Sequence, residues 1–306
     1  MAAARLSPLE WPTPAVDREL FLAQGFLIVD CIPPEHLDPL RSSFEALVDR
    51  QRAEWRAQGN NTWEKSAQPR LPAFDRLVDG EHTAFAMEFC LGSTTRGVCK
   101  ELMQADDAAN VAFFLMCSPQ EDHGPAHWHR DIHPIDQGPL QGLRQDMLDN
   151  QVRTALFREG SEIYRMRMWS INASATTMRN ALCVPVQAPG YLQWNISLYD
   201  DDVLWVIPGS HARPNTATEN NQLTANNRAP IEGGLRVTLK AGQGVVYTNT
   251  IFHWGSNYSR RLRRCVHLGF RAFGGESDRN LCRCYSVCII LTHFVIWMEY
   301  SLRCWL

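Results

Sequence analysis

Hydrophobic positions near the start of the chain follow the period of a helix. Residues 17–58 are predicted to be largely helical, because apolar side chains recur at helical spacing after Pro33-Pro34 and form one stripe. This stripe consists of Leu37, Leu40, Phe44, Leu47 and Val48. The short apolar run 25–29 is predicted to be the first strand. Residues 59–82 are polar and interrupted by prolines, which predicts a loop.

From Asn110 onward the pattern changes to short apolar runs separated by Gly, Pro and Asn. The runs cover residues 111–117, 196–198, 203–207, 235–239, 244–247 and 265–270. Runs of this length between turn residues favour an antiparallel sandwich or barrel. Together with the helical N-terminal part, they predict a mainly β jelly roll (cupin-like) that is buttressed by N-terminal helices.

Two stretches depart from this pattern. A helix over the mouth of the site is predicted at 141–152, and residues 151–188 lack clean periodicity, which indicates a lid or a disordered insertion. Residues 285–298 are apolar but too short to cross a bilayer comfortably, so they are interpreted as a docking helix or aberrant sequence, with a weak tail anchor as the alternative. We therefore expect a tail at 1–16, a single domain at 17–275 and an atypical apolar tail at 276–306.

The composition is that of an ordinary globular protein. Of the 306 residues, 45% are hydrophobic and 21% charged, which allows an ample core. A net charge of -3 without a basic block gives no reason to expect nucleic acid or an anionic membrane as partner. No secretory signal is recognised, which predicts a cytoplasmic protein whose ten cysteines are reduced thiols. The acidic run 200–202 is predicted to be a solvated turn, and the oligomeric state is left open.

The residues that carry candidate chemistry are His129, Asp131 and His253. A His-x-Asp pair followed by a distant His is the ligand order of the facial triad that holds non-haem Fe(II) and leaves the opposite coordination positions open. In a strand, residues two positions apart point to the same face, so His129 and Asp131 are expected to point the same way. This pattern predicts catalytic iron ligands at these three positions.

Arg264 follows His253 by eleven residues and is a candidate for binding a carboxylated co-substrate. Strand alternation puts it on the same face as Val266 and Leu268, and an arginine on an apolar face needs a partner. A carboxylate suits the planar fork of a guanidinium. The alternative is a buried ion pair with an Asp or Glu, and Arg263 is the rival by register.

Other histidines crowd the first ligand and raise zinc as a second interpretation. His123, His127 and His133 surround His129 in the sequence. Structural zinc favours closed tetrahedral sets, often with paired cysteines, and the Cys282-x-Cys284 pair is distant and has the wrong spacing. His127 and His133 are therefore interpreted as residues of the pocket rim rather than as ligands.

These motifs resemble the phytanoyl-CoA dioxygenase family of iron- and 2-oxoglutarate-dependent oxygenases. The resemblance covers roughly residues 17–273 and includes His129-x-Asp131, the run Val206-Ile207-Pro208-Gly209-Ser210-His211, His253 and Arg264. It implies a double-stranded β-helix core, iron held by His129, Asp131 and His253, and Arg264 on the distal carboxylate of 2-oxoglutarate. It also suggests that Trp194 lines the co-substrate, with a packing role as the alternative. The family often has a small hydroxyl residue two positions after the distal His; here Gly255 stands there and Ser256 follows it.

The function expected from these observations is Fe(II)- and 2-oxoglutarate-dependent hydroxylation of a small organic substrate, with succinate and CO2 as co-products. The alternative is a catalytically inactive binding protein on the same jelly-roll scaffold. Nothing in the sequence specifies the substrate, and no basic patch indicates a CoA thioester.

Overall fold

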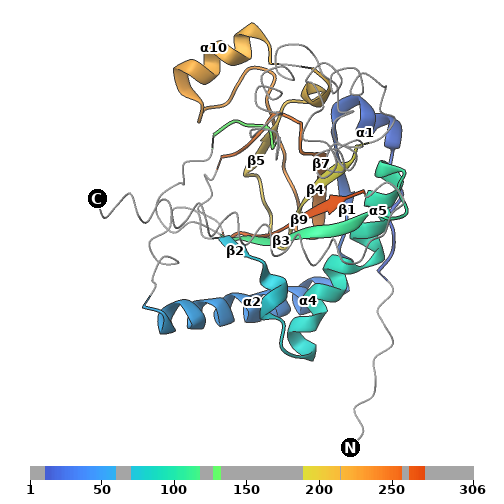
Figure 1. Cartoon of the computed structure of the whole chain (residues 1–306), viewed down its shortest axis with the longest axis vertical. Coiled ribbons are helices and arrows are strands. Elements are labelled where there is room, and N and C mark those ends of the chain that lie inside the picture. The colour runs from blue at the N-terminus through green and yellow to red at the C-terminus, as the bar shows by residue number, and fades with distance from the viewer. Residues whose placement is uncertain are drawn as a thin grey trace, which may run out of the picture.

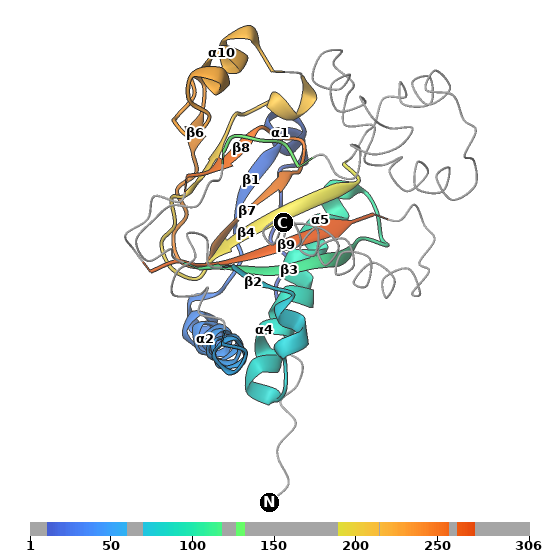
Figure 2. The same cartoon turned by 60° about the vertical axis from the view of Figure 1, so that its left-hand side comes forward.

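The computed structural model describes residues 11–59, 70–117, 127–131, 189–213, 215–256 and 262–272. Figures 1 and 2 show a large sheet with helices α2 (Pro34–Ala57) and α4 (Glu81–Leu91) on one side and a smaller sheet on the other. The expected helix at 141–152, the insertion at 151–188 and the apolar tail at 276–306 lie outside the described residues. Within the described part of the chain, no helix has the length and apolar character needed to span a bilayer.

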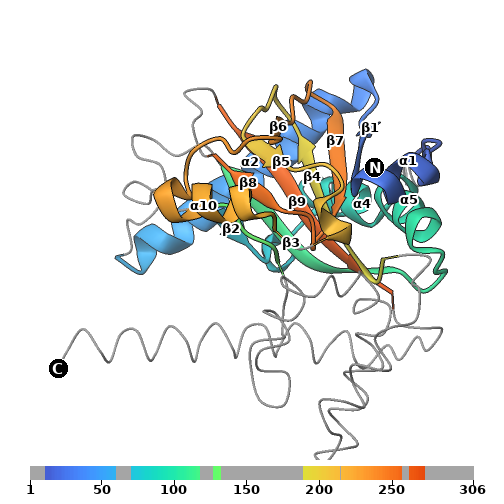
Figure 3. The same cartoon turned by 90° about the horizontal axis from the view of Figure 1, so that it is seen from above.

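The large sheet has six strands, each antiparallel to its neighbours, in the order β1-β7-β4-β9-β3-β2. In that order they are β1 (Phe26–Asp30), β7 (Gln243–Thr248), β4 (Tyr191–Ser197), β9 (Arg264–Arg271), β3 (Ala109–Cys117) and β2 (Arg70–Pro72). The smaller sheet contains β6 (Leu235–Arg236), β5 (Leu204–Val206) and β8 (His253–Gly255), with β5 in the middle. Seen from the side of the smaller sheet, β5 and β8 lie over β4 and β9 (Figure 3).

Helices surround the outer face and the edges of this arrangement. Besides α2 and α4 they are α1 (Arg18–Gln24), the 3-10 helix η1 (Phe74–Leu77), α5 (Ser93–Met103), the 3-10 helix η3 (Ser210–Ala212) and α10 (Ala217–Asn226). Helix α1 begins where the Asp17 side chain accepts a hydrogen bond from the Leu20 amide, and it ends at Gly25, whose φ of 85° favours glycine. A side chain at Gly25 would also collide with the His211 ring. The helix thus gives way to strand β1 within one residue.

The two faces of the large sheet bury different partners. Even-numbered positions such as Trp194 and Leu268 belong to the main core, which includes Phe44 of α2 and Phe89 of α4. Side chains of this size stabilise the fold by about 1.5–3 kcal/mol each when fully buried. Val245 and Tyr247 point the other way and pack with Leu204 and Val206 of the smaller sheet. The face of β4 and β9 that carries Gln193, Asn195 and His267 is therefore the inner face, directed between the sheets.

Most predicted elements are present, and two predictions need correction. The helical stripe forms α2, and the run 25–29 contains β1. The prediction of a loop at 59–82 is wrong at two places: Arg70–Pro72 forms strand β2, which pairs with β3, and Phe74–Leu77 forms the 3-10 helix η1. A three-residue edge strand with one buried residue, Leu71, is too short to show a period of two. The strand predicted at 235–239 shortens to Leu235–Arg236.

Candidate metal centre

Three side chains from distant parts of the sequence converge between the two sheets. The ligand atoms of His129, Asp131 and His253 all lie within 4.8 Å of one another. The two carboxylate oxygens of Asp131 face different rings: Oδ1 is 3.4 Å from Nε2 of His129, and Oδ2 is 3.4 Å from Nε2 of His253. Two imidazole nitrogens and one carboxylate therefore share a small volume, as the ligand order in the sequence predicts.

The main chain fixes the spacing of these side chains. The amide of His129 donates to the carbonyl of His253 at 2.9 Å, and the amide of His253 donates back at 3.0 Å. Two residues further on, the Asp131 amide donates to the Asn249 carbonyl, and the Asn249 side chain donates to the Asp131 carbonyl at 2.7 Å. Segment 127–131 thus lies along the start of β8 like a short strand. Because residues two positions apart in a strand point the same way, His129 and Asp131 lie on one face.

Hydrogen bonds at the far side of each ring set the tautomer of both histidines. Nδ1 of His129 lies 2.6 Å from the His127 carbonyl, and Nδ1 of His253 lies 2.9 Å from the Ile251 carbonyl. Because a carbonyl oxygen only accepts, each Nδ1 carries the proton and donates. In the neutral ring the Nε2 lone pair is then available to a metal, which is the usual arrangement of ligating histidines.

Asp131 is held by groups that favour its charged form. Burial alone would raise the pKa of Asp131, but the hydrogen bonds and positive charge that His129 and His253 supply when their Nε2 atoms are protonated outweigh it and hold that pKa well below its usual range. Gln193 of β4 also donates from Nε2 to Asp131 Oδ2 at 2.8 Å. A carboxylate that stays ionised between two imidazoles is a donor set suited to a divalent transition metal, so the residues present fit Fe(II).

Arg264 does not reach this cluster. It lies on the outer face of β9, where its Nε is 2.6 Å from Glu45 Oε1 and its Nη2 donates to Glu45 Oε2 at 3.0 Å. The apolar face that it shares with Val266 and Leu268 packs on the helices rather than on the space between the sheets. The structure therefore shows the ion-pair alternative for Arg264, with Glu45 of α2 as the partner.

Arg263 points to the inner face instead. Its Nε donates to Asp201 Oδ2 at 2.5 Å, and despite desolvation the charge of Asp201 raises the pKa of Arg263. The solvated turn predicted at 200–202 is wrong for Asp201, which is buried, whereas Asp200 is exposed. Its neighbours Asp200 and Asp202 pair with Lys240 and Arg236. These cations come from distant positions in the chain, so local sequence gives no sign of the pairing.

The two further co-substrate candidates lie in packing roles. Trp194 is fully buried on the helix-facing side, and its Nε1 donates to the Cys99 sulfur at 3.1 Å. The Ser256 hydroxyl donates to the Val203 carbonyl at 2.9 Å and ties the end of β8 to the start of β5. The structure brings neither of them to the three converging side chains, in contrast to Gln193, which the sequence pattern did not single out.

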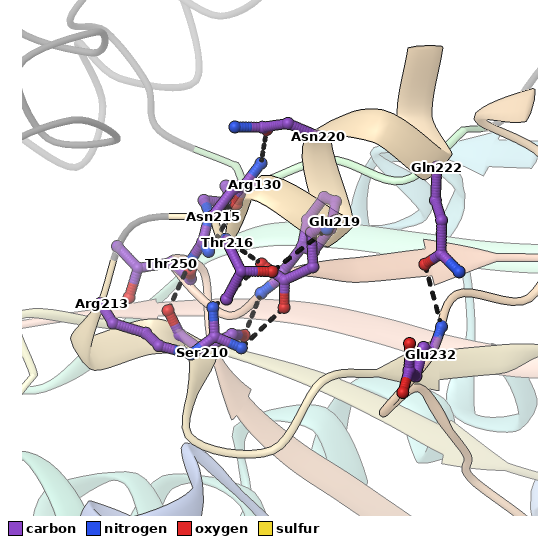
Figure 4. A network of polar contacts seen from close by, with 11 residues as sticks. Arg130, Ser210, Arg213, Asn215, Thr216, Glu219, Asn220, Gln222, Glu232 and Thr250 are labelled. Atoms are coloured by element: carbon purple, nitrogen blue, oxygen red, sulfur yellow. Dashed lines mark hydrogen bonds and ion pairs between the residues drawn. The ribbon is translucent and has the colours of Figure 1, made fainter. Parts of the chain in front are cut away.

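Arg130, between two of the converging residues, is a site residue that the sequence reasoning missed. It points away from the cluster into a buried network, where Nη1 donates to the carbonyls of Ser210 at 2.7 Å and Thr250 at 2.6 Å (Figure 4). Its Nη2 donates to Asn215 Oδ1 at 2.8 Å, and the guanidinium lies 5.3 Å from the centre of the Phe252 ring. Burial lowers the pKa of Arg130 to about 10, which leaves it charged at neutral pH. The alternation of side chains along an extended segment could have predicted this position, because a residue between two ligands on one face must point to the opposite face.

No cysteine joins the candidate metal centre within the described ranges. There, His129, Asp131 and His253 are the one group of three or more potential ligands. The described cysteines Cys31, Cys90, Cys99, Cys117 and Cys265 are free and buried, which confirms the prediction of reduced thiols for these positions. His127 is exposed and contributes its carbonyl rather than its ring, while His123 and His133 lie outside the described residues.

Comparisons with known proteins place the fold. No family model matches the sequence, and no curated protein matches it. Among solved structures, EctD from S. alaskensis with 2-oxoglutarate and 5-hydroxyectoine has a TM-score of 0.51 at 15% identity, over 89% of this chain and 86% of that one. HygX from Streptomyces hygroscopicus with nickel and 2-oxoglutarate has a TM-score of 0.52 at 10% identity, and the alignment covers 85% of this chain and 88% of HygX. At these identities the likeness concerns the fold: antiparallel sheets with helices, as in these 2-oxoglutarate-binding proteins.

Proposed function

We propose that this protein is an Fe(II)- and 2-oxoglutarate-dependent dioxygenase that hydroxylates a small organic substrate. The observation that carries the proposal is the convergence of His129, Asp131 and His253, with both Nδ1 atoms hydrogen-bonded to carbonyls and both Nε2 atoms near the carboxylate. These three residues would hold the metal and would leave coordination positions for a co-substrate and O2.

The chain's own residues bind, orient and shield the reacting groups. When bound, iron with 2-oxoglutarate and O2 supplies the oxidising power, and succinate and CO2 are the co-products. Gln193 holds the Asp131 carboxylate, and the main-chain pairing of His129 with His253 fixes the ligand spacing. The smaller sheet covers part of the inner face, because Val245 and Tyr247 pack with Leu204 and Val206 of β5.

Arg263, rather than Arg264, is the cation that binds the far carboxylate of 2-oxoglutarate in this proposal. Arg263 immediately precedes β9 and points to the inner face. Tyr247 also points to this face, and its ring centre lies 5.4 Å from that of His253. The Asp201 carboxylate orients the guanidinium through Nε. Arg264 instead stabilises the contact between β9 and α2 through Glu45.

The structural neighbours support the same proposal. EctD and HygX both hold 2-oxoglutarate, and HygX also holds nickel, on folds that align over most of this chain. Two facing antiparallel sheets, with the metal ligands on the smaller sheet's side, support the assignment of a double-stranded β-helix core. The finer resemblance to the phytanoyl-CoA dioxygenase family stays a prediction from the motifs.

The experiment that tests the proposal is conversion of 2-oxoglutarate to succinate by purified protein supplied with Fe(II) and O2. Slow succinate formation without added substrate is expected for wild type, with loss in His129→Ala and Asp131→Ala. His127→Ala is the matched control, because that side chain is exposed and is not one of the converging ligands. A folded wild-type protein that binds 2-oxoglutarate but forms no succinate would favour the inactive binding protein.

A further inference from the structure

The edge strand β2 places an arginine on the inner face of the large sheet. In β2, Leu71 is buried in the helix-side core, so its neighbour Arg70 points to the opposite face. Arg70 pairs in register with Met116, and its guanidinium lies 5.8 Å from the centre of the Phe114 ring. This is an accessible cation at the border of the inner face.

A continuous wall of side chains links Arg70 to the candidate metal centre. The Phe114 ring lies 5.9 Å from the ring of His267, and Nδ1 of His267 is 2.7 Å from Asn195 Oδ1. Asn195 shares its face of β4 with Gln193, the residue that donates to Asp131. The wall therefore runs from a cation, across an aromatic ring and an imidazole, to the metal ligand.

Within the described ranges, no ion pair balances the charge of Arg70. Among the described residues no carboxylate lies within ion-pair distance of it, whereas the inner-face Arg263 pairs with Asp201 and the outer-face Arg264 with Glu45. The surrounding protein removes part of its hydration, which lowers the pKa of Arg70, while the charge of Asp131 counteracts this shift. An accessible, partly desolvated guanidinium is a good receptor for a carboxylate.

We infer that the organic substrate carries a single carboxylate, which Arg70 binds while the body of the substrate lies along Phe114 and His267 toward the metal. This inference rests on the proposed function and adds the substrate class. One guanidinium balances one negative charge, and the rest of the wall, Phe114, His267 and Asn195, offers no second cation for another. An aromatic ring beside the cation offers a surface for an apolar or planar substrate body.

The experiment is a calorimetric titration of the protein with matched acids and amides: benzoate and benzamide, phenylacetate and phenylacetamide. It is done on metal-free protein and again under anaerobic conditions with Fe(II) and 2-oxoglutarate. At least one acid is expected to bind about tenfold or more tightly than its amide, because a charge-assisted hydrogen bond is lost in the amide. Arg70→Met removes this preference and Arg70→Lys keeps part of it, while the Kd for 2-oxoglutarate is unchanged in both.

The outcomes separate this inference from the proposed function. Equal binding of acids and amides, binding of neither, or a preference that survives in Arg70→Met overturns the inference. A weaker Kd for 2-oxoglutarate in Arg70→Met also overturns it, since Arg70 would then serve the co-substrate. Absence of an iron-2-oxoglutarate complex in wild type counts against the proposed function alone, because the titration of metal-free protein still tests Arg70. Arg228→Met, at an exposed position, is the control for loss of one positive charge.

Discussion

His129 and His253 pair through their main chains as neighbours in a sheet do, with amide-to-carbonyl distances of 2.9 and 3.0 Å in the two directions. Their ring centres are 4.4 Å apart, and both Nε2 atoms lie near Asp131. A ligand in segment 127–131 and a ligand at the start of β8 are thus held in register by backbone hydrogen bonds. The metal affinity of the site should therefore depend on backbone and supporting contacts as well as on the three ligands.

Gln193 supports the site through its hydrogen bond to Asp131. Gln193→Leu removes the donor that orients the carboxylate, and we expect Fe(II) to bind about 10- to 100-fold more weakly. Gln243→Leu is the matched control, because Gln243 bonds with Asp30 at the far end of the sheet. Equilibrium dialysis of Fe(II) under anaerobic conditions measures the effect. Equal affinity in wild type and Gln193→Leu would contradict this role.

Arg130 fastens the ligand-bearing segment to η3 and to the loop before β8. In Arg130→Met the carbonyls of Ser210 and Thr250 lose their charged donor, so we expect the free energy of unfolding to fall by about 2–4 kcal/mol. Denaturant unfolding of the metal-free protein measures this loss. Arg228→Met, at an exposed position, should change stability by less than about 0.5 kcal/mol. An Arg130→Met protein as stable as this control would show that the network contributes little.

Arg263, just before β9, and Arg264, its first residue, point to opposite faces of the large sheet, so their substitutions should have different effects. Arg263→Leu is expected to raise the Kd for 2-oxoglutarate by about tenfold or more, because it removes a charged hydrogen-bond donor. Arg264→Leu is expected instead to lower the free energy of unfolding by about 2 kcal/mol, since it leaves Glu45 without its partner. Calorimetric titration and denaturant unfolding of both variants separate the two roles. The reverse pattern would restore Arg264 as the co-substrate residue.

His267 should make stability fall in mild acid. Burial lowers the pKa of His267 from the usual 6.5 to about 4. The groups whose charges also act on this pKa are Asp131, Arg70, His253 and Arg263. Because the unfolded chain takes up a proton near pH 6.5 and the folded one does not, stability is fully present above pH 6.5 and falls toward pH 4.

The size of this effect is about 1–3 kcal/mol for a shift of this order. It is measured by urea unfolding of metal-free protein between pH 7 and pH 4, compared with His267→Gln, which does not titrate in this range. The free energy of unfolding is expected to fall more steeply with decreasing pH in wild type than in His267→Gln. Parallel curves would show that His267 does not carry the pH dependence.

The sequence predicts the candidate site better than its surroundings. A His and an Asp two positions apart, followed by a distant second His, are enough to predict the convergence of His129, Asp131 and His253. The reason is that the alternation of side chains along an extended segment is a local property. The same alternation puts Arg264 on an apolar face, but which layer that face meets depends on how α2 packs, and this is a tertiary property. The prediction of a solvated turn at Asp201 fails for the same reason, since its partner Arg263 is 62 residues away.

Short elements and the contacts that support the ligands are the other features that the sequence did not predict. The strand at Arg70–Pro72 has too few residues to show a period, although it positions the cation on which the substrate inference rests. Gln193 and Arg130 belong to no ligand motif, and their roles follow from hydrogen bonds across sequence separations of 62 and 120 residues. Helix α2, by contrast, is predictable because its apolar stripe repeats over many turns.

The most direct test of the central claim is an anaerobic titration of metal-free protein with Fe(II) and 2-oxoglutarate, followed by the visible charge-transfer absorption of their chelate. Wild type is compared with His253→Ala and with His127→Ala, whose side chain is exposed. We expect the absorption in wild type and in His127→Ala and its loss in His253→Ala. A well-folded wild-type protein that shows no such absorption would contradict the assignment of His129, Asp131 and His253 as an iron site.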